Sequence, residues 1–189
     1  MTENPEVELV LYAMKSRLKK VAFLDRDGTL MLDEGYSSDP SMITIIPGAP
    51  EALRELRRKG YLLVVITNQS GVGRAFFTED KVRLMNSRMS ELFAAEKVSF
   101  DGFFICPHRP DEGCECRKPR PGMLLEAAEK LEIDLGNSIM VGDKMSDVEA
   151  GLAAGCRLNI LVGANSSKGK DSDKRVAFVE KISDVVGLI

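Results

Sequence analysis

Two aspartates separated by one residue carry the first chemical signal in this sequence. The apolar run 21–24 ends at Asp25, and Asp27 and Gly28 follow closely. In an extended chain residues two apart point the same way, so both carboxylates can face one ligand. Adjacent carboxylates repel each other unless a cation lies between them, and Mg²⁺, which prefers oxygen ligands, is the ordinary candidate. Taken alone, the motif fits a pair of turn-forming aspartates equally well.

Four further residues add groups suited to a phosphate ester. Thr67 follows the apolar run 61–66, and a hydroxyl beside exposed backbone N–H groups makes a phosphate cradle. Asp143 offers a third carboxylate to a cation. Lys118 is a compact charge suited to a phosphoryl oxygen, and Arg117 is a fork suited to bidentate contact. Each signal is weak alone, and together they predict phosphoryl chemistry.

A short cysteine- and histidine-rich segment predicts a zinc site. Cys106, His108, Cys114 and Cys116 include three of the four cysteines and the single histidine. Three thiolates and one imidazole satisfy tetrahedral Zn²⁺, and four protein ligands make the metal structural. An exposed reducing loop and a Cys114–Cys116 disulfide are the alternatives. Zinc would stiffen the loop and thereby fix the two cations that follow it.

The elements that must position these residues alternate between strands and helices. Apolar runs predict five strands, at residues 21–24, 61–66, 102–105, 138–141 and 158–162. Helix starts are predicted at Pro50, at Thr78, at Pro121 and at a capping box formed by Ser146 and Glu149. This alternation predicts an α/β fold, a three-layer Rossmann-like parallel sheet with helices on both faces.

In open α/β sheets ligands bind beyond the carboxyl ends of the strands. We therefore expect Asp25, Thr67, Cys106 and Asp143 to meet at one edge of the sheet. Lys144, directly after Asp143, is expected to touch substrate or to balance charge.

Composition limits the partners of the chain. It has 189 residues, and 26 basic against 29 acidic residues give a net charge of −3. This balance argues against a nucleic-acid or anionic-membrane binder. We expect a helical extension over residues 1–19, one domain over 20–189 and a mobile loop over 163–175. The N-terminal segment lacks a secretory pattern, so we expect a cytoplasmic protein. We also expect it to be a monomer.

The motifs Asp25–Thr29, Thr67–Gly71, Lys118 and Gly142–Asp143 resemble those of the haloacid-dehalogenase-like (HAD-like) phosphatases. The loop 106–119 is similar to that of the D-glycero-D-manno-heptose 1,7-bisphosphate 7-phosphatase family, whose relatives include histidinol-phosphate phosphatases. The resemblance covers about residues 20–163. It implies a capless enzyme that acts on a sugar bisphosphate in the synthesis of nucleotide-activated heptose for lipopolysaccharide.

The resemblance also implies roles for individual residues. Asp25 is the nucleophile that becomes an aspartyl-phosphate, and Asp27 is the general acid and then the general base. Mg²⁺ is held by the Asp25 carboxylate, the Asp27 carbonyl and Asp143. Thr67 and Lys118 stabilise the phosphoryl group. The implied substrate contacts are Asp33, Glu34, Gly35, Tyr36, Asn68, Gln69, Ser70 and Arg117.

One position departs from the family pattern. Ala75 stands where the family often has glycine, and a positive φ there would strain an alanine. We expect a local adjustment without loss of activity.

Three other functions compete with this assignment. A histidinol-phosphate phosphatase would share the site, and a nucleic-acid 3′-phosphatase would share the loop that begins at Thr67. The acidic balance of the chain argues against the latter. A zinc-stabilised phosphate-binding module without catalysis requires idle carboxylates, which the full set of motifs disfavours.

Overall fold

Six parallel strands form the centre of the protein. A computed structural model describes residues 18–35, 39–163 and 172–189. The strand order is β3-β2-β1-β4-β5-β6, and every neighbouring pair is parallel. The strands are β1 (Val21–Leu24), β2 (Leu62–Asn68), β3 (Gly102–Cys106), β4 (Ile139–Gly142), β5 (Leu158–Val162) and β6 (Val176–Val179). This order places the first strand inside the sheet, as in a Rossmann-like fold, and confirms the predicted fold class.

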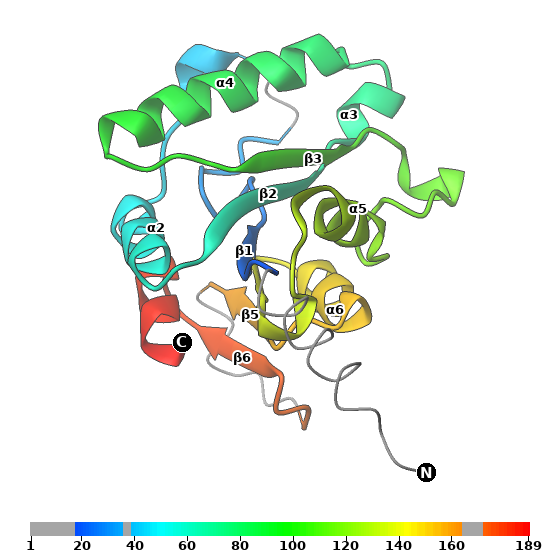
Figure 1. Cartoon of the computed structure of the whole chain (residues 1–189). Coiled ribbons are helices and arrows are strands. Elements are labelled where there is room, and N and C mark those ends of the chain that lie inside the picture. Colours follow the sequence, from blue (N-terminus) through cyan, green and yellow to red (C-terminus); the bar gives the residue numbers. More distant parts are fainter. Residues whose placement is uncertain (1–17, 36–38, 164–171) are drawn as a thin grey trace, which may run out of the picture.

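Helices cover both faces of the sheet (Figure 1). They are α2 (Ala49–Arg58), α3 (Ser70–Gly73), α4 (Glu79–Ala95), α5 (Gly122–Leu131) and α6 (Met145–Ala154). Short 3₁₀ turns are η1 (Pro40–Met42), η2 (Pro110–Glu112), η3 (Leu135–Asn137) and η5 (Ile182–Leu188). The link from β1 to α2 holds only η1 in its described part, which agrees with a site that has no large cap.

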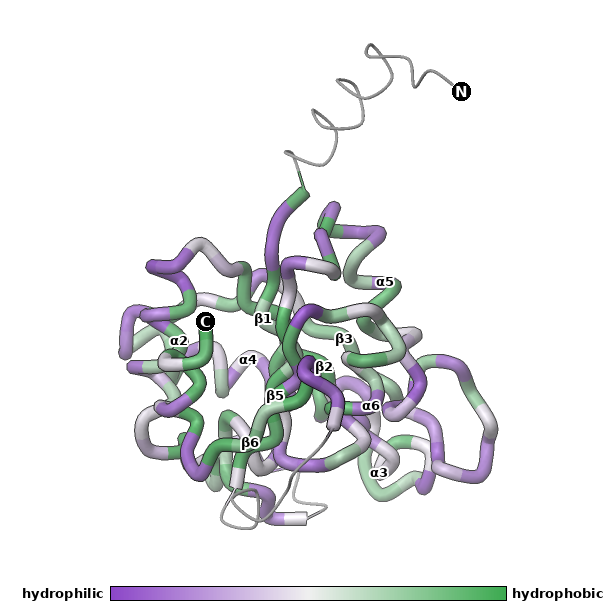
Figure 2. Tube along the Cα trace, turned by 90° about the horizontal axis from the view of Figure 1, so that it is seen from below, coloured by the Kyte–Doolittle hydropathy of each residue, from purple (hydrophilic) through white to green (hydrophobic). Residues whose placement is uncertain are grey.

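The alternation of side chains along β1 assigns each helix to a face. Ala22 and Leu24 pack in one apolar cluster with α2, α4 and η5. Val21 and Phe23 point the other way and pack in a second cluster with α5 and α6. Both faces of the strand are fully buried, which is why its sequence is continuously apolar. Figure 2 shows the apolar strands at the centre of the chain trace.

The long helix α4 follows from its sequence. The hydroxyl of Thr78 accepts a hydrogen bond from the N–H of Lys81, as predicted for an N-cap. Met85, Met89 and Phe93 recur at helical spacing and are buried against the sheet. The methionines therefore belong to the core.

The start of α6 differs from the prediction. Ser146 and Glu149 do not form the expected capping box, because the helix already begins at Met145. Asp147 caps it instead, and its carboxylate accepts the N–H of Lys144 at 3.0 Å. The prediction was wrong because Ser146 and Glu149 fit the capping pattern by type, whereas the aspartate between them reaches the preceding N–H.

Several predictions concern residues outside the described part. They are the helix over 1–19, apart from its last two residues, most of the loop 163–175, and Tyr36. The division into an extension and one domain therefore stays a prediction. Among the described residues, none of the helices has the length and apolar content needed to cross a bilayer.

Candidate active site

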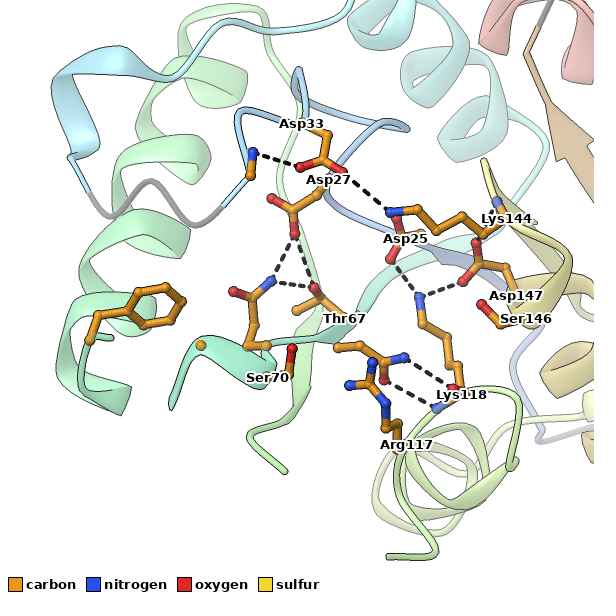
Figure 3. Close-up of a pocket in the computed structure, with 15 residues that line it drawn as sticks. Asp25, Asp27, Asp33, Thr67, Ser70, Arg117, Lys118, Lys144, Ser146 and Asp147 are labelled. Atoms are coloured by element: carbon orange, nitrogen blue, oxygen red, sulfur yellow. Dashed lines mark hydrogen bonds and ion pairs between the residues drawn. The ribbon is translucent and has the colours of Figure 1, made fainter. Parts of the chain in front are cut away.

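Of the four residues predicted to meet at the carboxyl edge of the sheet, Asp25 and Thr67 line one cavity (Figure 3). Asp143 lies beside Asp25 without lining the cavity, and Cys106 is buried with the other cysteines of its loop. The cavity has a volume of about 380 Å³. It is lined by Asp25, Asp27, Asp33, Gly35, Thr67, Asn68, Gln69, Ser70, Gly71, Phe77, Arg117, Lys118, Lys144, Ser146 and Asp147. Contributions therefore come from the ends of β1 and β2, the loop before α5 and the start of α6. This is where ligands bind in open α/β sheets.

Lys118 joins two of these segments by a pair of buried ion pairs. Its ammonium lies 2.5 Å from Asp25 Oδ1 and 2.6 Å from Asp147 Oδ1, and it donates to the carbonyl of Ile66 at 2.8 Å. Burial by itself would lower the pKa of Lys118, but the charges of the two carboxylates outweigh burial and raise it. The lysine is therefore a permanent cation beside Asp25.

The segment that carries Lys118 is fixed by Asn68. The side-chain amide of Asn68 donates to the carbonyl of Lys118 and accepts its N–H, both at 3.1 Å. Arg117 donates to the carbonyl of His108 at 3.3 Å, which ties it to the cysteine-rich loop. Arg117 and Lys118 both line the cavity, and these hydrogen bonds fix their positions.

The carboxylate of Asp27 lies on the other side of the cavity. Arg26 donates to it through Nε and Nη2 at 3.0–3.2 Å, and the Gln69 amide donates to it at 2.8 Å. Thr67 Oγ1 lies 3.3 Å from the same carboxylate. Arg26 is itself anchored to Asn86 of α4 at 2.9 Å. Asp27 is therefore oriented by three separate elements.

Three carboxylates gather beneath the cavity in a way that fits a divalent cation. One oxygen from each of Asp25, Asp143 and Asp147 lies within 4.8 Å of the others. The Oδ1 atom of Asp143 is buried and has no hydrogen-bond partner among the described residues. A buried carboxylate oxygen without a donor is costly unless a cation completes it.

The backbone leaves room for this carboxylate cluster at Gly28. A Cβ atom at this position would lie 2.4 Å from Asp143 Oδ2. The φ of +88° is also one that glycine adopts readily. The position of the Asp143 carboxylate therefore requires glycine at residue 28.

The charges of the carboxylates raise one another's pKa. Burial, and then the charge of Asp25, raises the pKa of Asp143 to about 7. Burial also raises the pKa of Asp25, and Lys118 opposes this rise only in part. The single charge of Lys118 therefore does not balance the negative charges of the three carboxylates, and Mg²⁺ would supply the missing positive charge.

The predicted zinc ligands lie together in space. The Sγ atoms of Cys106 and Cys114 are 3.6 Å apart, and those of Cys114 and Cys116 are 3.5 Å apart. His108 Nδ1 lies 3.7 Å from Cys106 Sγ and 3.2 Å from Cys116 Sγ. Tetrahedral zinc with bonds of about 2.0–2.3 Å separates its ligands by roughly 3.3–3.8 Å. The four cysteines are free thiols, so the disulfide alternative does not hold in this structure.

The remaining predicted substrate contacts divide into two groups. Asp33 and Lys144 form an ion pair of 3.3 Å at one side of the cavity (Figure 3), and Gly35 and Ser70 also line the cavity. Glu34 lines a separate, smaller hollow beside Met42.

Sequence reasoning gave too little weight to two residues at the site. From the sequence, Asp147 is a first-turn helix residue whose carboxylate favours the helix dipole, and that accounts for it without a role in the site; in the structure it is fully buried against Lys118. Arg26 received no role, yet it holds Asp27. The only signal for Arg26 was its position between two functional aspartates.

Ala75 adopts the strained backbone expected from its departure from the family pattern. Its φ is +57°, in the left-handed region that favours glycine. The turn is nevertheless closed, since the N–H of Ala75 donates to Val72 and that of Phe76 to Gly71.

Sequence comparisons agree with the geometry. A profile of the HAD-hydrolase-like family matches residues 115–186. A D-glycero-beta-D-manno-heptose-1,7-bisphosphate 7-phosphatase of Pasteurella multocida is 42% identical over 179 residues, which cover 91% of this chain and 97% of the relative. The enzyme of the same name from Escherichia coli K12 is 44% identical over 147 residues, or 74% of this chain and 77% of the relative.

Solved structures give the same result. The D,D-heptose 1,7-bisphosphate phosphatase of B. bronchiseptica, complexed with magnesium and phosphate, superimposes with a TM-score of 0.80. It is 30% identical, with 90% of this chain and 97% of that chain covered. The chain is therefore a phosphoric monoester hydrolase of the HAD-like phosphatases and belongs to the D-glycero-D-manno-heptose 1,7-bisphosphate 7-phosphatase family.

Proposed function

We propose that this protein is a Mg²⁺-dependent phosphatase that removes the 7-phosphate of D-glycero-D-manno-heptose 1,7-bisphosphate. The observation that carries the proposal is the buried ion pair of Asp25 and Lys118 at the floor of the cavity. It sets a carboxylate nucleophile beside a cation that can neutralise a phosphoryl oxygen. The substrate is supported by the names of relatives at 42–46% identity, and the pathway would be the supply of activated heptose for lipopolysaccharide.

In the first step Asp25 attacks phosphorus. An oxygen of its carboxylate forms a bond to phosphorus while the bond between phosphorus and the sugar oxygen breaks. The leaving oxygen takes a proton from Asp27, and the product is an aspartyl-phosphate and the dephosphorylated sugar position. Lys118 and Thr67 stabilise the charge on the transferred group.

In the second step Asp27 acts as a base. It takes a proton from a water molecule, whose oxygen attacks the phosphorus of the aspartyl-phosphate. The bond to Asp25 breaks, inorganic phosphate leaves and the carboxylate is restored. Gln69 and Arg26 support this exchange because they hold the Asp27 side chain between the two steps.

Two metals complete the proposal. Asp25, Asp143 and the carbonyl of Asp27 would hold Mg²⁺, which when bound neutralises the anionic phosphate. Cys106, His108, Cys114 and Cys116 would hold a structural zinc; they are the four residues grouped in the loop. Arg117 donates a hydrogen bond to the carbonyl of His108, so a zinc ion bound by His108 would also fix the Arg117 guanidinium at the cavity.

Substrate recognition is assigned to the rim of the cavity. Asp33 and Lys144 form an ion pair there. The hydroxyl groups of a sugar bisphosphate can replace Lys144 as partners of Asp33, and its phosphate groups can replace Asp33 as partners of Lys144. We assign further contacts to Glu34, Gly35, Tyr36 and Arg117. Asn68, Gln69 and Ser70 line the cavity from the loop that follows β2.

The substrate assignment is tested by the ratio of two kcat/KM values. Phosphate release is measured with heptose 1,7-bisphosphate, as both anomers, and with histidinol phosphate, because this ratio reports discrimination in the transition state. We expect the bisphosphate to be preferred by at least about 100-fold. A preference for histidinol phosphate would overturn the sugar assignment and leave the phosphatase chemistry intact.

The enzyme would act as a monomer in the cytoplasm, on a small sugar phosphate and without nucleic acid or membrane as a partner. The near balance of charges supports this. Light scattering of the purified protein would test the monomer directly. Phosphate release from a 3′-phosphorylated oligonucleotide, at a rate comparable to that from the sugar, would contradict the choice of substrate.

A further inference from the structure

A second polar hollow lies at the opposite edge of the sheet from the active site. Its volume is about 410 Å³, within the range of small-ligand sites. It is lined by Lys20, Lys59, Tyr61, Asn137, Arg157 and Ile189. Four of these residues directly precede strands or lie within two residues of them, and the strands are parallel, so the hollow faces away from the cavity of Asp25.

Two of the three cations of this hollow are held in place by the neutral side chain of Tyr61. Lys20 Nζ lies 4.5 Å from the centre of the Tyr61 ring, and Arg157 donates to the Tyr61 hydroxyl at 2.9 Å. Lys59 Nζ donates to the carbonyl of Val186 at 3.3 Å and to the terminal carboxylate of Ile189, so this lysine has an anionic partner. Tyr61 is only 4% exposed, so it is a fixed platform for two of the charges.

The positive charges of Lys20 and Arg157 are not neutralised by the described chain. Among the described residues, Lys20, Lys59 and Arg157 form no ion pair with an aspartate or glutamate. Several exposed arginines elsewhere are paired, as Arg83 is with Asp80. The carboxylate of Asp134 borders this region and accepts the Asn137 amide at 2.8 Å. Two unpaired cations, Lys20 and Arg157, share one hollow, where they repel each other and attract an anion.

We propose that this hollow is a second, non-catalytic binding site for a phosphate dianion. The Arg157 guanidinium offers a planar fork for two oxygens, and the lysines add point charges around it. The ligand is either inorganic phosphate, which the enzyme releases, or the phosphate group of a small organic ester. Neither requires the machinery around Asp25, so the proposal is independent of the substrate assigned above.

Tyr61 provides a reporter that the active site does not influence directly. The chain has three tyrosines, so selective ¹³C labelling of tyrosine rings gives few signals, and Tyr61→Phe assigns the one that matters. The full-length protein is titrated with inorganic phosphate, and separately with a phosphonate analogue of glycerol phosphate that cannot be hydrolysed. Sodium chloride at matched ionic strength is the blank. We expect a saturable shift of the Tyr61 signals that the blank does not produce.

A pair of double variants distinguishes a site from general attraction. Lys20→Met with Arg157→Met removes two cations of the hollow, and we expect the apparent Kd to weaken by about tenfold or more. Arg83→Met with Lys130→Met removes the same charge from exposed positions and should leave the Kd unchanged. Saturation by phosphate alone, or by the phosphonate alone, identifies the source of the dianion. An unshifted Tyr61 signal with both ligands, or equal weakening in both double variants, would overturn the proposal.

Discussion

At the scale of single residues, the site is organised by buried charges that depend on each other. Lys118 stands between Asp25 and Asp147, and Arg26 stands beside Asp27. Each cation is nearly inaccessible to solvent, so each contributes more than a surface ion pair would. Removing one partner leaves the other as an uncompensated charge in a poorly solvated place. We therefore expect effects on chemistry before effects on substrate affinity.

Arg26→Met should lower kcat and leave KM nearly unchanged. The guanidinium orients the Asp27 carboxylate but does not line the cavity, so its loss misplaces the proton donor without removing a substrate contact. Misplacement of a reacting group costs about 10–100-fold in rate. Steady-state kinetics separate the two constants. Asn86→Ala, which removes only the far partner of Arg26, is the matched control and should cost less. A rise in KM at constant kcat would contradict this role.

Metal-free protein should lose stability as the pH rises through about 7. The pKa of Asp143 is raised from 3.8 to about 7 in the folded chain by burial and by Asp25. The folded state therefore binds this proton more tightly than the unfolded state. The resulting contribution to the free energy of unfolding is complete below about pH 4 and disappears as the pH rises through about 7.

Mg²⁺ can take the place of that proton. Saturating Mg²⁺ should raise the melting temperature by a few degrees at about pH 8 and by less at about pH 5.5. Thermal denaturation at both pH values measures the effect, and Asp143→Asn serves as the control because it lacks the titrating group. Stabilisation that is equal at both pH values would show that Asp143 does not exchange its proton for the metal.

At the scale of elements, the cysteine-rich loop connects the four candidate zinc ligands to the active site. The loop follows β3, carries η2 and leads into Arg117 and Lys118 before α5 begins. Arg120 donates to the carbonyls of Gly113 and Cys114, which closes the loop on itself. Its short helical content and exposed turns supply little apolar burial. A metal bound by the four candidate ligands would therefore add the rigidity that this loop otherwise lacks.

Cys116→Ser should remove zinc and lower both stability and activity. We expect the protein to lose its zinc, to melt at a lower temperature and to lose at least about tenfold in kcat/KM, because Arg117 and Lys118 lose their fixed position. Elemental analysis of the purified protein and steady-state kinetics are the measurements. Cys156→Ala is the matched control, since Cys156 is buried apart from the cluster and should leave the zinc content unchanged. Full activity in a zinc-free variant would contradict the role of the loop.

Elements were predictable where apolar runs are local and continuous. The first five strands lie within two residues of the predicted bounds. Each is a mainly apolar run, because a strand buried on both faces needs apolar residues on both. The start of α6 was missed because Asp147 serves two partners, the N–H of Lys144 and the ammonium of Lys118. The second partner comes from a distant segment, and residue spacing holds no information on such a contact.

At the scale of the whole molecule, the parallel sheet separates two polar edges. The carboxyl ends of the strands gather the aspartates, and the amino ends gather Lys20, Lys59 and Arg157. The first gathering could be predicted for Asp25 and Asp143, because each lies within two residues of the end of an apolar run. The second could not, because isolated lysines and arginines are common on surfaces. Only the packing around Tyr61 brings them together.

The central claim is that Asp25 forms a covalent bond to the phosphoryl group, and it is tested most directly by trapping that bond. Enzyme in excess over heptose 1,7-bisphosphate is quenched in acid during a single turnover with Mg²⁺, and the peptides are analysed by mass spectrometry. We predict one phosphoryl group on the peptide that contains Asp25, and its absence in Asp25→Asn or without Mg²⁺. Phosphate release by Asp25→Asn at the wild-type rate, or a phosphoryl group on a different residue, would contradict the account.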